Sequence, residues 1–237
     1  MADFAYLIEP PFNYRQPDGT VTGCDVELAR TVLAMAGISD VRMVETEFAQ
    51  LLSGLGDGRW RMTTGLFSTE ERRKIADFSR PIWALPDGLL VHRGNPLQLT
   101  GYASVARSRD CVLAVIRDQF QHRSAVEFGV PDDRILIFET YTDAAAAVLD
   151  GRAGACASVA RAHGGYLEQN PDLPLEIVTV GRQEKEPAFG SFAFGKSDIA
   201  FRQAIDDALL AYLGSAEHRA MMRSFGFDDA EIDLVIG

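Results

Sequence analysis

Cysteine is scarce in this chain of 237 residues, and long apolar runs are missing. The three cysteines, Cys24, Cys111 and Cys156, form neither a C-x-x-C pair nor a metal-site spacing. An odd count does not make a disulfide framework, so buried free thiols are the favoured interpretation, with a Cys111–Cys156 pair as the alternative. No apolar stretch approaches the roughly 20 residues that a membrane span needs.

Positive charge and histidine are also in short supply. The chain has 23 Lys and Arg against 34 Asp and Glu, a net charge of −11. Such an excess of negative charge argues against nucleic acid or an anionic membrane surface as a partner. The four histidines are scattered, and no zinc, haem, Walker or dinucleotide motif is present, so we expect no metal and no cofactor.

Strand-like and helix-like segments alternate along the chain, which is typical of α/β architecture. The first strand is predicted at FAYLI, residues 4–8, and the first helix at residues 25–36. The clearest helix covers residues 201–213, where apolar residues recur at helical spacing and Ser197 can cap the start. No Gly/Ser-rich or charged linker divides the sequence into separate halves.

The most informative segment covers residues 55–81, LGDGRWRMTTGLFSTEERRKIADFSRP. Residues 62–66 suit a short buried strand, and Ser68 or Thr69 can cap the helix that follows. Arg72 comes one turn into that helix, close to its free backbone N–H groups, where a guanidinium suits a small carboxylate. The competing interpretation is that Arg72 is one more solvated arginine in a basic stretch.

This segment resembles the signature of family 3 of the bacterial extracellular solute-binding proteins, roughly T-x-x-R-x-x-x-x-x-F-S-x-P. The matching residues are Thr69, Arg72, Phe78, Ser79 and Pro81. A second piece, residues 9–29, resembles the family's P-F turn and the G-x-x-x-G-x-D-x-x-L-A that opens its first helix. There the matches are Gly19, Gly23, Asp25, Leu28 and Ala29. The likeness covers essentially the whole chain.

The resemblance implies a two-lobed α/β fold of the type II periplasmic-binding-protein class with two crossing hinge segments. Lobe one would comprise residues 1–91 plus 192–237, and lobe two residues 94–188. The hinges would lie near residues 91–93 and 189–191. The ligand would lie between the lobes at the carboxyl ends of sheet strands, where open α/β sheets usually bind.

Five positions of lobe one resemble the pocket of the ectoine-binding branch of this family: Glu9, Phe12, Phe48, Phe67 and Arg72. In that branch, aromatic rings surround the cationic part of a zwitterion, a glutamate pairs with that charge, and the arginine takes the carboxylate. The chemistry is coherent, because each aromatic face can hold a weakly hydrated cation with about 0.5–2 kcal/mol. The simpler interpretation of any single phenylalanine is core packing.

Lobe two departs from the amino-acid binders of the family. Those proteins usually carry a G-T turn after the first strand of this lobe, where this chain has Arg117, Asp118, Gln119 and Phe120. We expect Asp118 and Gln119 to contribute to the site, with an ordinary loop as the alternative. Elsewhere, Gly154, Val159 and Arg61 stand at positions where family members commonly have aspartate. A standard α-amino acid is therefore a poor expectation for the ligand.

The preferred interpretation is a monomeric binding module that delivers a small zwitterionic ligand to the transmembrane permease subunits of an ABC importer. Lobe closure around the ligand would be the mechanism. One alternative is an enzyme resembling the cyclohexadienyl dehydratases of the same fold, which would need a general acid such as Glu9 or Asp118. Another is the sensor domain of a receptor kinase.

Location follows from the same resemblance. No export signal precedes the first strand, and members of the family are normally exported. We therefore expect a native protein with an export segment, either periplasmic or lipid-anchored outside the cell, with a cytoplasmic protein as the alternative.

Overall fold

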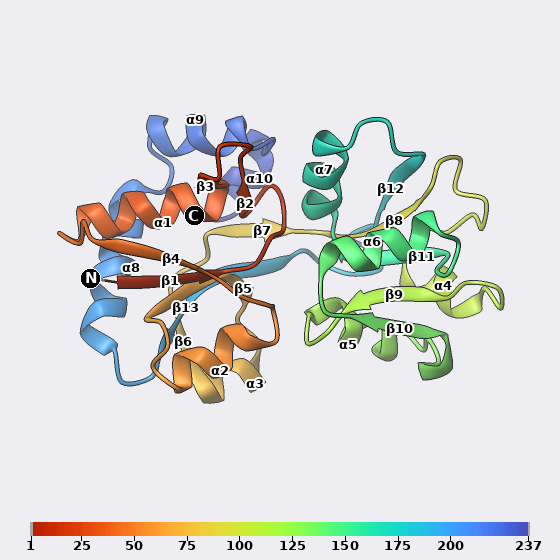
Figure 1. The fold of residues 1–237 in the computed structure, drawn as a ribbon, viewed down its shortest axis with the longest axis horizontal. Helices are drawn as coiled ribbons and strands as arrows, with labels where there is room; N and C mark the ends of the chain where they lie inside the picture. The colour runs from red at the N-terminus through yellow and green to blue at the C-terminus, as the bar shows by residue number, and fades with distance from the viewer. Residues whose placement is uncertain (1, 237) are drawn as a thin grey trace. The chain divides into compact units, whose positions relative to one another are not determined.

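The computed structural model describes residues 2–236, and the chain divides into two compact units (Figure 1). Unit 1 is Met1–Ala84 with Ala188–Gly237, and unit 2 is Leu85–Pro187, so the chain passes between the units twice. The α/β class predicted from the alternating segments is confirmed. The first crossing expected from the sequence, near residues 91–93, falls at the end of a strand that pairs inside unit 2. The hinge positions stay a prediction.

Unit 1 is built on a six-stranded mixed sheet in the order β4-β1-β5-β13-β6, with β7 paired to β13. Strand β1 runs parallel to β4 and β5, whereas β13 runs antiparallel to β5 and β6. The strands are β1 (Ala2–Tyr6), β4 (Val41–Glu45), β5 (Met62–Phe67), β6 (Ala76–Phe78), β7 (Trp83–Leu85) and β13 (Ala188–Gly195). A small hairpin is formed by β2 (Tyr14–Arg15) and β3 (Val21–Thr22).

Helices cover both faces of this sheet. They are α1 (Cys24–Met35), α2 (Gln50–Gly56), α3 (Glu70–Ile75), α8 (Ile199–Tyr212), α9 (Ala216–Ser224) and α10 (Asp229–Asp233). Helix α1 packs against α8 and α9, and it lies along one side of β1 and β4, with α2 and α3 on the opposite side (Figure 1). The core is the apolar layer between the sheet and these helices, where Phe4, Val32 and Phe194 are fully buried.

Two helix starts were predicted from capping residues, with different outcomes. Thr69 is the N-cap of α3, and its hydroxyl accepts a hydrogen bond from the Arg72 backbone N–H at 3.3 Å, as predicted. The Ser197 cap is wrong, because α8 begins at Ile199 with Asp198 at the N-cap position. The Asp198 carboxylate caps nothing, since Arg61 holds it at 2.7 Å.

Unit 2 contains a five-stranded sheet in the order β10-β9-β11-β8-β12. The first three strands are parallel, and β8 runs antiparallel to both β11 and β12. The strands are β8 (Asp87–His92), β9 (Leu113–Ile116), β10 (Ile135–Phe138), β11 (Ala155–Val159) and β12 (Leu175–Thr179). The α-helices are α4 (Tyr102–Arg107), α5 (Phe120–Glu127), α6 (Tyr141–Leu149) and α7 (Ala160–Gln169), and a 3₁₀ turn covers Asp132–Arg134.

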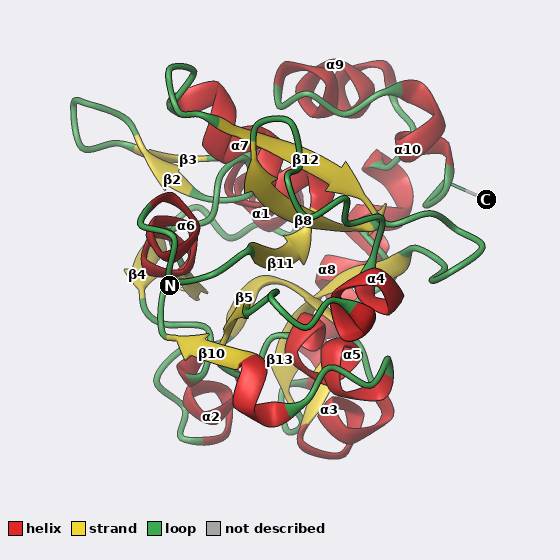
Figure 2. Ribbon diagram, turned by 90° about the vertical axis from the view of Figure 1, so that its right-hand side faces the viewer, coloured by secondary structure: helices red, strands yellow, loops and turns green. Residues whose placement is uncertain are grey.

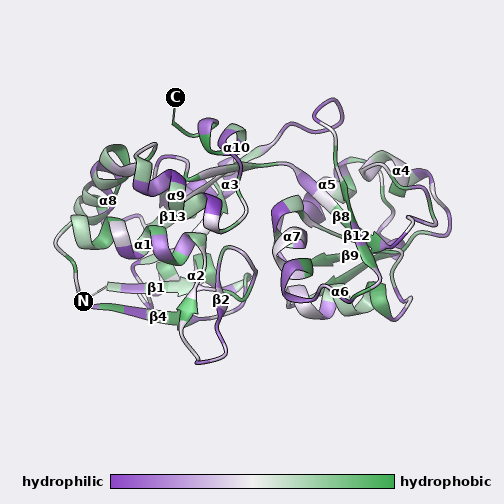
Figure 3. Cartoon of the chain, turned by 90° about the horizontal axis from the view of Figure 1, so that it is seen from above, coloured by the Kyte–Doolittle hydropathy of each residue, from purple (hydrophilic) through white to green (hydrophobic). Residues whose placement is uncertain are grey.

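The helices of unit 2 enclose a continuous apolar core. Helices α6 and α7 pack on the sheet, and α4 lies next to α5 (Figure 2). Strand β9 is coloured hydrophobic along its length, whereas α7 also carries hydrophilic residues (Figure 3). The core residues Leu89, Tyr102, Leu113 and Val115 are fully buried.

The three cysteines are buried and none forms a disulfide, so the predicted buried thiols are confirmed and the alternative Cys111–Cys156 pair is wrong. Burial raises the pKa of the Cys111 thiol to about 11, which keeps it protonated and unreactive. Across residues 2–236, no helix is both long and apolar enough to cross a bilayer. The same residues contain no group of three or more His, Cys, Asp or Glu side chains arranged for a metal ion.

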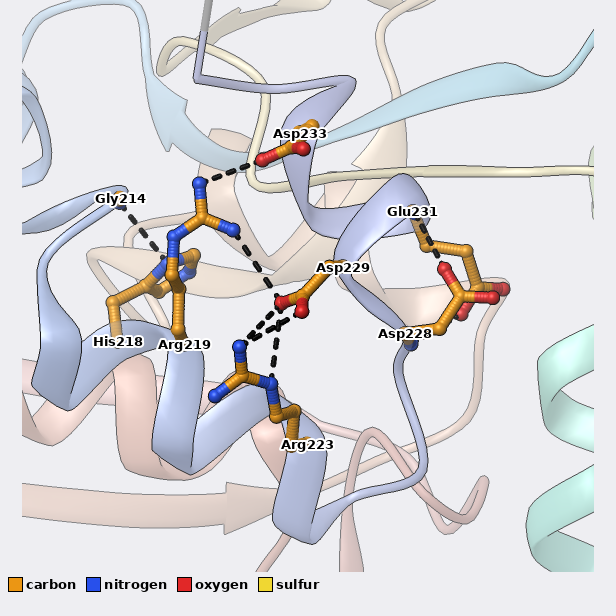
Figure 4. Close-up of polar contacts among 8 residues, drawn as sticks. All are labelled: Gly214, His218, Arg219, Arg223, Asp228, Asp229, Glu231 and Asp233. Atoms are coloured by element: carbon orange, nitrogen blue, oxygen red, sulfur yellow. Dashed lines mark hydrogen bonds and ion pairs between the residues drawn. The ribbon is translucent and has the colours of Figure 1, made fainter.

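Helices α9 and α10 are joined by arginine–aspartate pairs (Figure 4). Arg219 contacts Asp229 at 3.5 Å and Asp233 at 2.6 Å, and Arg223 contacts Asp229 at 2.6 Å. Exposed pairs of this kind are each worth little, but a network sharing one carboxylate restricts how α10 can lie on α9. Phe227, in the connection between the two helices, is buried.

His163 is a fully buried histidine in α7 with two partners in unit 2. Its Nε2 lies 3.1 Å from the Gly88 carbonyl oxygen, and its Nδ1 lies 2.6 Å from the Tyr141 hydroxyl. A carbonyl only accepts, so Nε2 carries the hydrogen and Nδ1 accepts from the tyrosine. Burial lowers the pKa of His163 to about 4.

This histidine should make the protein less stable in mild acid. An unfolded chain binds a proton at an ordinary histidine below about pH 6.5, whereas the folded protein resists protonation of His163 down to about pH 4. The free energy of unfolding should therefore fall between those values, by up to about 3 kcal/mol from this group. His163→Gln should flatten the slope in urea denaturation across pH 7 to 4.5, although burial also lowers the pKa of His218.

The matched control is His122→Gln, since His122 lies half-buried on α5 of the same unit. It should keep the parent's pH dependence. An unchanged slope in His163→Gln would contradict the assignment.

Candidate ligand-binding site

The turn after β1 places two of the candidate residues. The Glu9 backbone N–H donates to the Asn13 carbonyl at 2.9 Å, and the Phe12 N–H donates back to the Glu9 carbonyl at 3.0 Å. This tight turn buries both Glu9 (8% exposed) and Phe12 (4% exposed). A carboxylate at this depth is costly without a partner of opposite charge or several hydrogen-bond donors.

Three further candidates meet at the end of β5. Phe67 is the last residue of that strand, and the Arg72 guanidinium donates to the Phe67 carbonyl at 3.1 Å. The same guanidinium lies 5.2 Å from the centre of the Phe48 ring, a cation–π distance. Phe48 lies in the turn just before α2, half-buried against the core. Arg72 is therefore fixed beside two of the candidate aromatic residues.

Trp83 belongs to the same group of aromatic residues, although no local sequence pattern predicted it. Its ring centre lies 5.3 Å from that of Phe12 and 5.6 Å from that of Phe67. The available signal was the pair Gly65 and Gly190, since a side chain at either position would collide with the indole. That signal can be used only once the register of β5 and β13 is known.

A buried polar network lies beneath these rings. The Asp25 carboxylate, 1% exposed, accepts from the Thr64 hydroxyl at 2.5 Å, the Gly65 N–H at 2.7 Å and the Trp83 indole N–H at 3.0 Å. Burial raises the pKa of Asp25, while these donors act in the opposite direction. The Asn13 amide donates to Thr64 at 2.8 Å, which ties the turn after β1 to the same network.

Two of the residues that replace the family's aspartates, Arg61 and Gly154, are used for packing and hydrogen bonding within their own units. Arg61 forms two hydrogen bonds to Asp198, at 2.7 and 2.8 Å, and its guanidinium lies 4.0 Å from the centre of the Phe201 ring. Gly154 is closely packed, because an added Cβ would lie 2.7 Å from Leu97 Cδ1 and 3.2 Å from Cys111 Sγ. Neither position can therefore supply a carboxylate to an ammonium group.

The two candidates of unit 2 lie at the start of α5. Asp118 has a positive φ of 61°, and Gln119 occupies the N-cap position with 5% of its surface exposed. Both border an open hollow of about 510 Å³. Its other lining residues are His122, Arg123, Val126 and Glu127. The structure thus keeps these two candidates together on unit 2, and the other five on unit 1.

A buried ion pair fixes the first turn of α5. Asp87 accepts from Lys185 Nζ at 2.6 Å, from the Tyr102 hydroxyl at 2.7 Å and from the Gln121 amide at 2.8 Å. The Lys185 ammonium also lies 4.6 Å from the centre of the Phe120 ring. This cluster is held by four segments of unit 2 and sets the position of the loop that carries Asp118 and Gln119.

Known proteins resemble the chain over nearly its full length. The model of bacterial extracellular solute-binding proteins, family 3, matches residues 5–227. A probable amino-acid ABC transporter periplasmic-binding protein of Sinorhizobium fredii is 29% identical over 227 residues, covering 92% of this chain and 74% of that protein. The arginine-binding protein ArgT of Corynebacterium glutamicum is 26% identical over 231 residues, covering 94% and 73%.

Among solved structures, EhuB in complex with hydroxyectoine superimposes with a TM-score of 0.88 at 27% sequence identity. The match covers 98% of this chain and 91% of that one.

Removing the Asp25 carboxylate should destabilise the protein strongly. Asp25→Ala leaves the donors of Thr64, Gly65 and Trp83 buried without their acceptor, at about 1–3 kcal/mol each. We expect a loss of about 3 kcal/mol or more in chemical denaturation at pH 7, and a smaller loss for Asp25→Asn, which keeps one carbonyl oxygen.

Asp57→Ala is the control for that measurement, because Asp57 is exposed and lies 3.6 Å from Arg59 at the surface. Its effect should stay within about 0.5 kcal/mol. If Asp25→Ala is no less stable than Asp57→Ala, the network does not support unit 1.

Proposed function

The chain belongs to the bacterial extracellular solute-binding proteins of family 3, and on that premise we propose that it captures a small zwitterion carrying a weakly hydrated cation. The family and the two-lobed α/β periplasmic-binding-protein-like fold, both expected from the sequence, are confirmed. The chain is a solute-binding protein of the amino-acid ABC transporter type, and the relatives support binding rather than the dehydratase alternative.

The observation that carries the proposal is the grouping of aromatic rings with Arg72 in unit 1. Phe12 and Phe67 both contact Trp83, and the Arg72 guanidinium contacts the Phe67 carbonyl and the Phe48 ring. Aromatic faces attract a cation, and a guanidinium grips a carboxylate with two parallel hydrogen bonds. A ligand with both groups would use every member of this set.

The likeness to EhuB supports the same class of ligand. That structure is described as a complex with hydroxyectoine, a molecule with a carboxylate and a delocalised ring cation. We propose ectoine-like or betaine-like solutes for this chain, with the cation against Phe12, Phe48 and Phe67. Glu9 would complement the cation electrostatically. Asp118 and Gln119 would supply polar contacts from unit 2.

A basic amino acid is the second candidate, because one relative is an arginine-binding protein. A guanidinium is also a delocalised cation that aromatic faces hold well. Weighing against it, the chain has Gly154 and Val159 where the family's amino-acid binders often have an aspartate for the α-ammonium group. An added side chain at position 154 would collide with Leu97.

The biological role follows from the family. We propose that the ligand favours a closed state of the two lobes by its higher affinity for that state, and that the closed protein docks on the permease subunits of the importer. The protein would act as a monomer in the periplasm, or anchored by a lipid outside the cell. No reaction of the ligand is part of this proposal.

Arg72→Ala should remove most of the ligand affinity. A charge-assisted bidentate contact is worth about 1.5–3 kcal/mol, so calorimetry with hydroxyectoine, glycine betaine and arginine should show a loss of about tenfold or more for the best ligand. The control is Arg73→Ala, since Arg73 makes comparable contacts to the Ser68 carbonyl and the Phe78 ring. Equal affinities in the two variants would place the carboxylate elsewhere.

The aromatic site should distinguish a cation from an uncharged group of the same shape. Glycine betaine and tert-butylacetate differ only in a quaternary nitrogen replaced by carbon. The parent should bind the betaine more tightly, and Phe67→Leu should reduce that preference by about fivefold, or about 1 kcal/mol, because leucine lacks the ring quadrupole. Glu9→Gln should weaken binding of the betaine and spare binding of tert-butylacetate, which lacks the cation.

Phe78→Leu is the control for this comparison. Phe78 is a buried core ring of the same unit, so its loss should lower stability but leave the preference for the cation unchanged. If Phe67→Leu and Glu9→Gln both bind like the parent, the phenylalanines serve only the core.

A further inference from the structure

Trp83 contacts two of the rings proposed to surround the cation. Its indole packs on Phe12 with an interplanar angle of 42° and on Phe67 with an angle of 75°, both within 6 Å between ring centres. The tryptophan itself is 6% exposed. It is placed to support the two phenylalanines from behind.

The orientation of this indole is fixed from several sides. Its N–H donates to the buried Asp25 carboxylate at 3.0 Å. A Cβ atom at Gly65 would come within 2.7 Å of the indole, and one at Gly190 within 2.1 Å, so the ring lies directly on the backbone of β5 and β13. The hydrogen bond and this close packing together leave the ring one orientation.

We propose that Trp83 is a positioning residue that sets the selectivity of the site for a cation, by holding the Phe12 and Phe67 rings at fixed angles. The inference rests on the proposed function. An aromatic ring attracts a cation at its face and repels it at its edge, so the attraction depends on ring orientation. An uncharged tert-butyl group in the same place depends on bulk and contact area alone.

Trp83 and Gly190 both lie close to the points where the chain leaves and re-enters unit 1. Trp83 immediately precedes Ala84, the last residue of unit 1 before unit 2, and Gly190 follows soon after the return at Ala188. The Ile82 N–H donates to the Gly190 carbonyl at 2.8 Å, which joins the two connecting segments. A methyl group added at Gly190 would overlap the indole and should shift it, while every side chain proposed to contact the ligand is still present.

Two independent variants test the inference, Trp83→Leu and Gly190→Ala. The measurement is the ratio of dissociation constants for tert-butylacetate and glycine betaine in titration calorimetry. We expect the preference for the betaine to fall about fivefold or more in both variants, and Trp83→Phe, which keeps a ring, to retain part of it. Gly56→Ala is the control, because an added Cβ there has no atom within 4 Å, and its ratio should equal the parent's.

The outcomes separate this inference from the proposed function. If the parent binds the betaine no better than tert-butylacetate, the proposed function fails. If the parent prefers the betaine and both variants weaken the two ligands by the same factor, Trp83 only fills space and the inference is overturned. An unchanged ratio in both variants overturns it as well. Should Trp83→Leu not fold, Gly190→Ala decides, because it removes no side chain that is proposed to contact the ligand.

Discussion

The buried carboxylate of Asp25 is the interaction on which the arrangement of unit 1 depends. Its side chain leaves the first turn of α1 and accepts hydrogen bonds from the Thr64 hydroxyl, the Gly65 N–H and the Trp83 indole. A carboxylate with 1% exposure is costly unless donors converge on it, and burial accordingly raises its pKa. Three segments far apart in the sequence are thereby joined at one group: the start of α1, the middle of β5 and the start of β7.

The aromatic residues are placed by that polar network. Trp83 is held by its hydrogen bond to Asp25 and in turn contacts Phe12 and Phe67. The ring of Phe227, from the α9–α10 connection, has its centre 6.5 Å from that of Phe12. Rings packed in this way have few alternative orientations. In unit 2, the Asp87 cluster likewise fixes the first turn of α5.

Two departures from the family pattern have a structural explanation in this chain. Arg61 is used to hold Asp198 at the start of α8, and Gly154 leaves space that Leu97 and Cys111 fill. Each residue stabilises its own unit at a position where family members commonly have an aspartate. The chain thus retains the family's arginine at Arg72, whose guanidinium contacts the Phe48 ring and the Phe67 carbonyl.

The sequence by itself determined the α/β class, the family and the strand at residues 62–66, and it limited the cap of α3 to Ser68 or Thr69, because each depends on residues close together in the chain. Periodicity, turn residues and capping act over a few positions, so they can be read directly. The start of α8 was misplaced for the opposite reason: Asp198 is held by Arg61, 137 residues away in sequence. Trp83 was not predicted for the same reason. Its hydrogen bond to Asp25 spans 58 residues, and the packing of its indole against Gly65 and Gly190 depends on strand register. Only the tertiary structure decided which side chains support the aromatic rings, because that support comes from contacts between strands whose pairing no local pattern specifies.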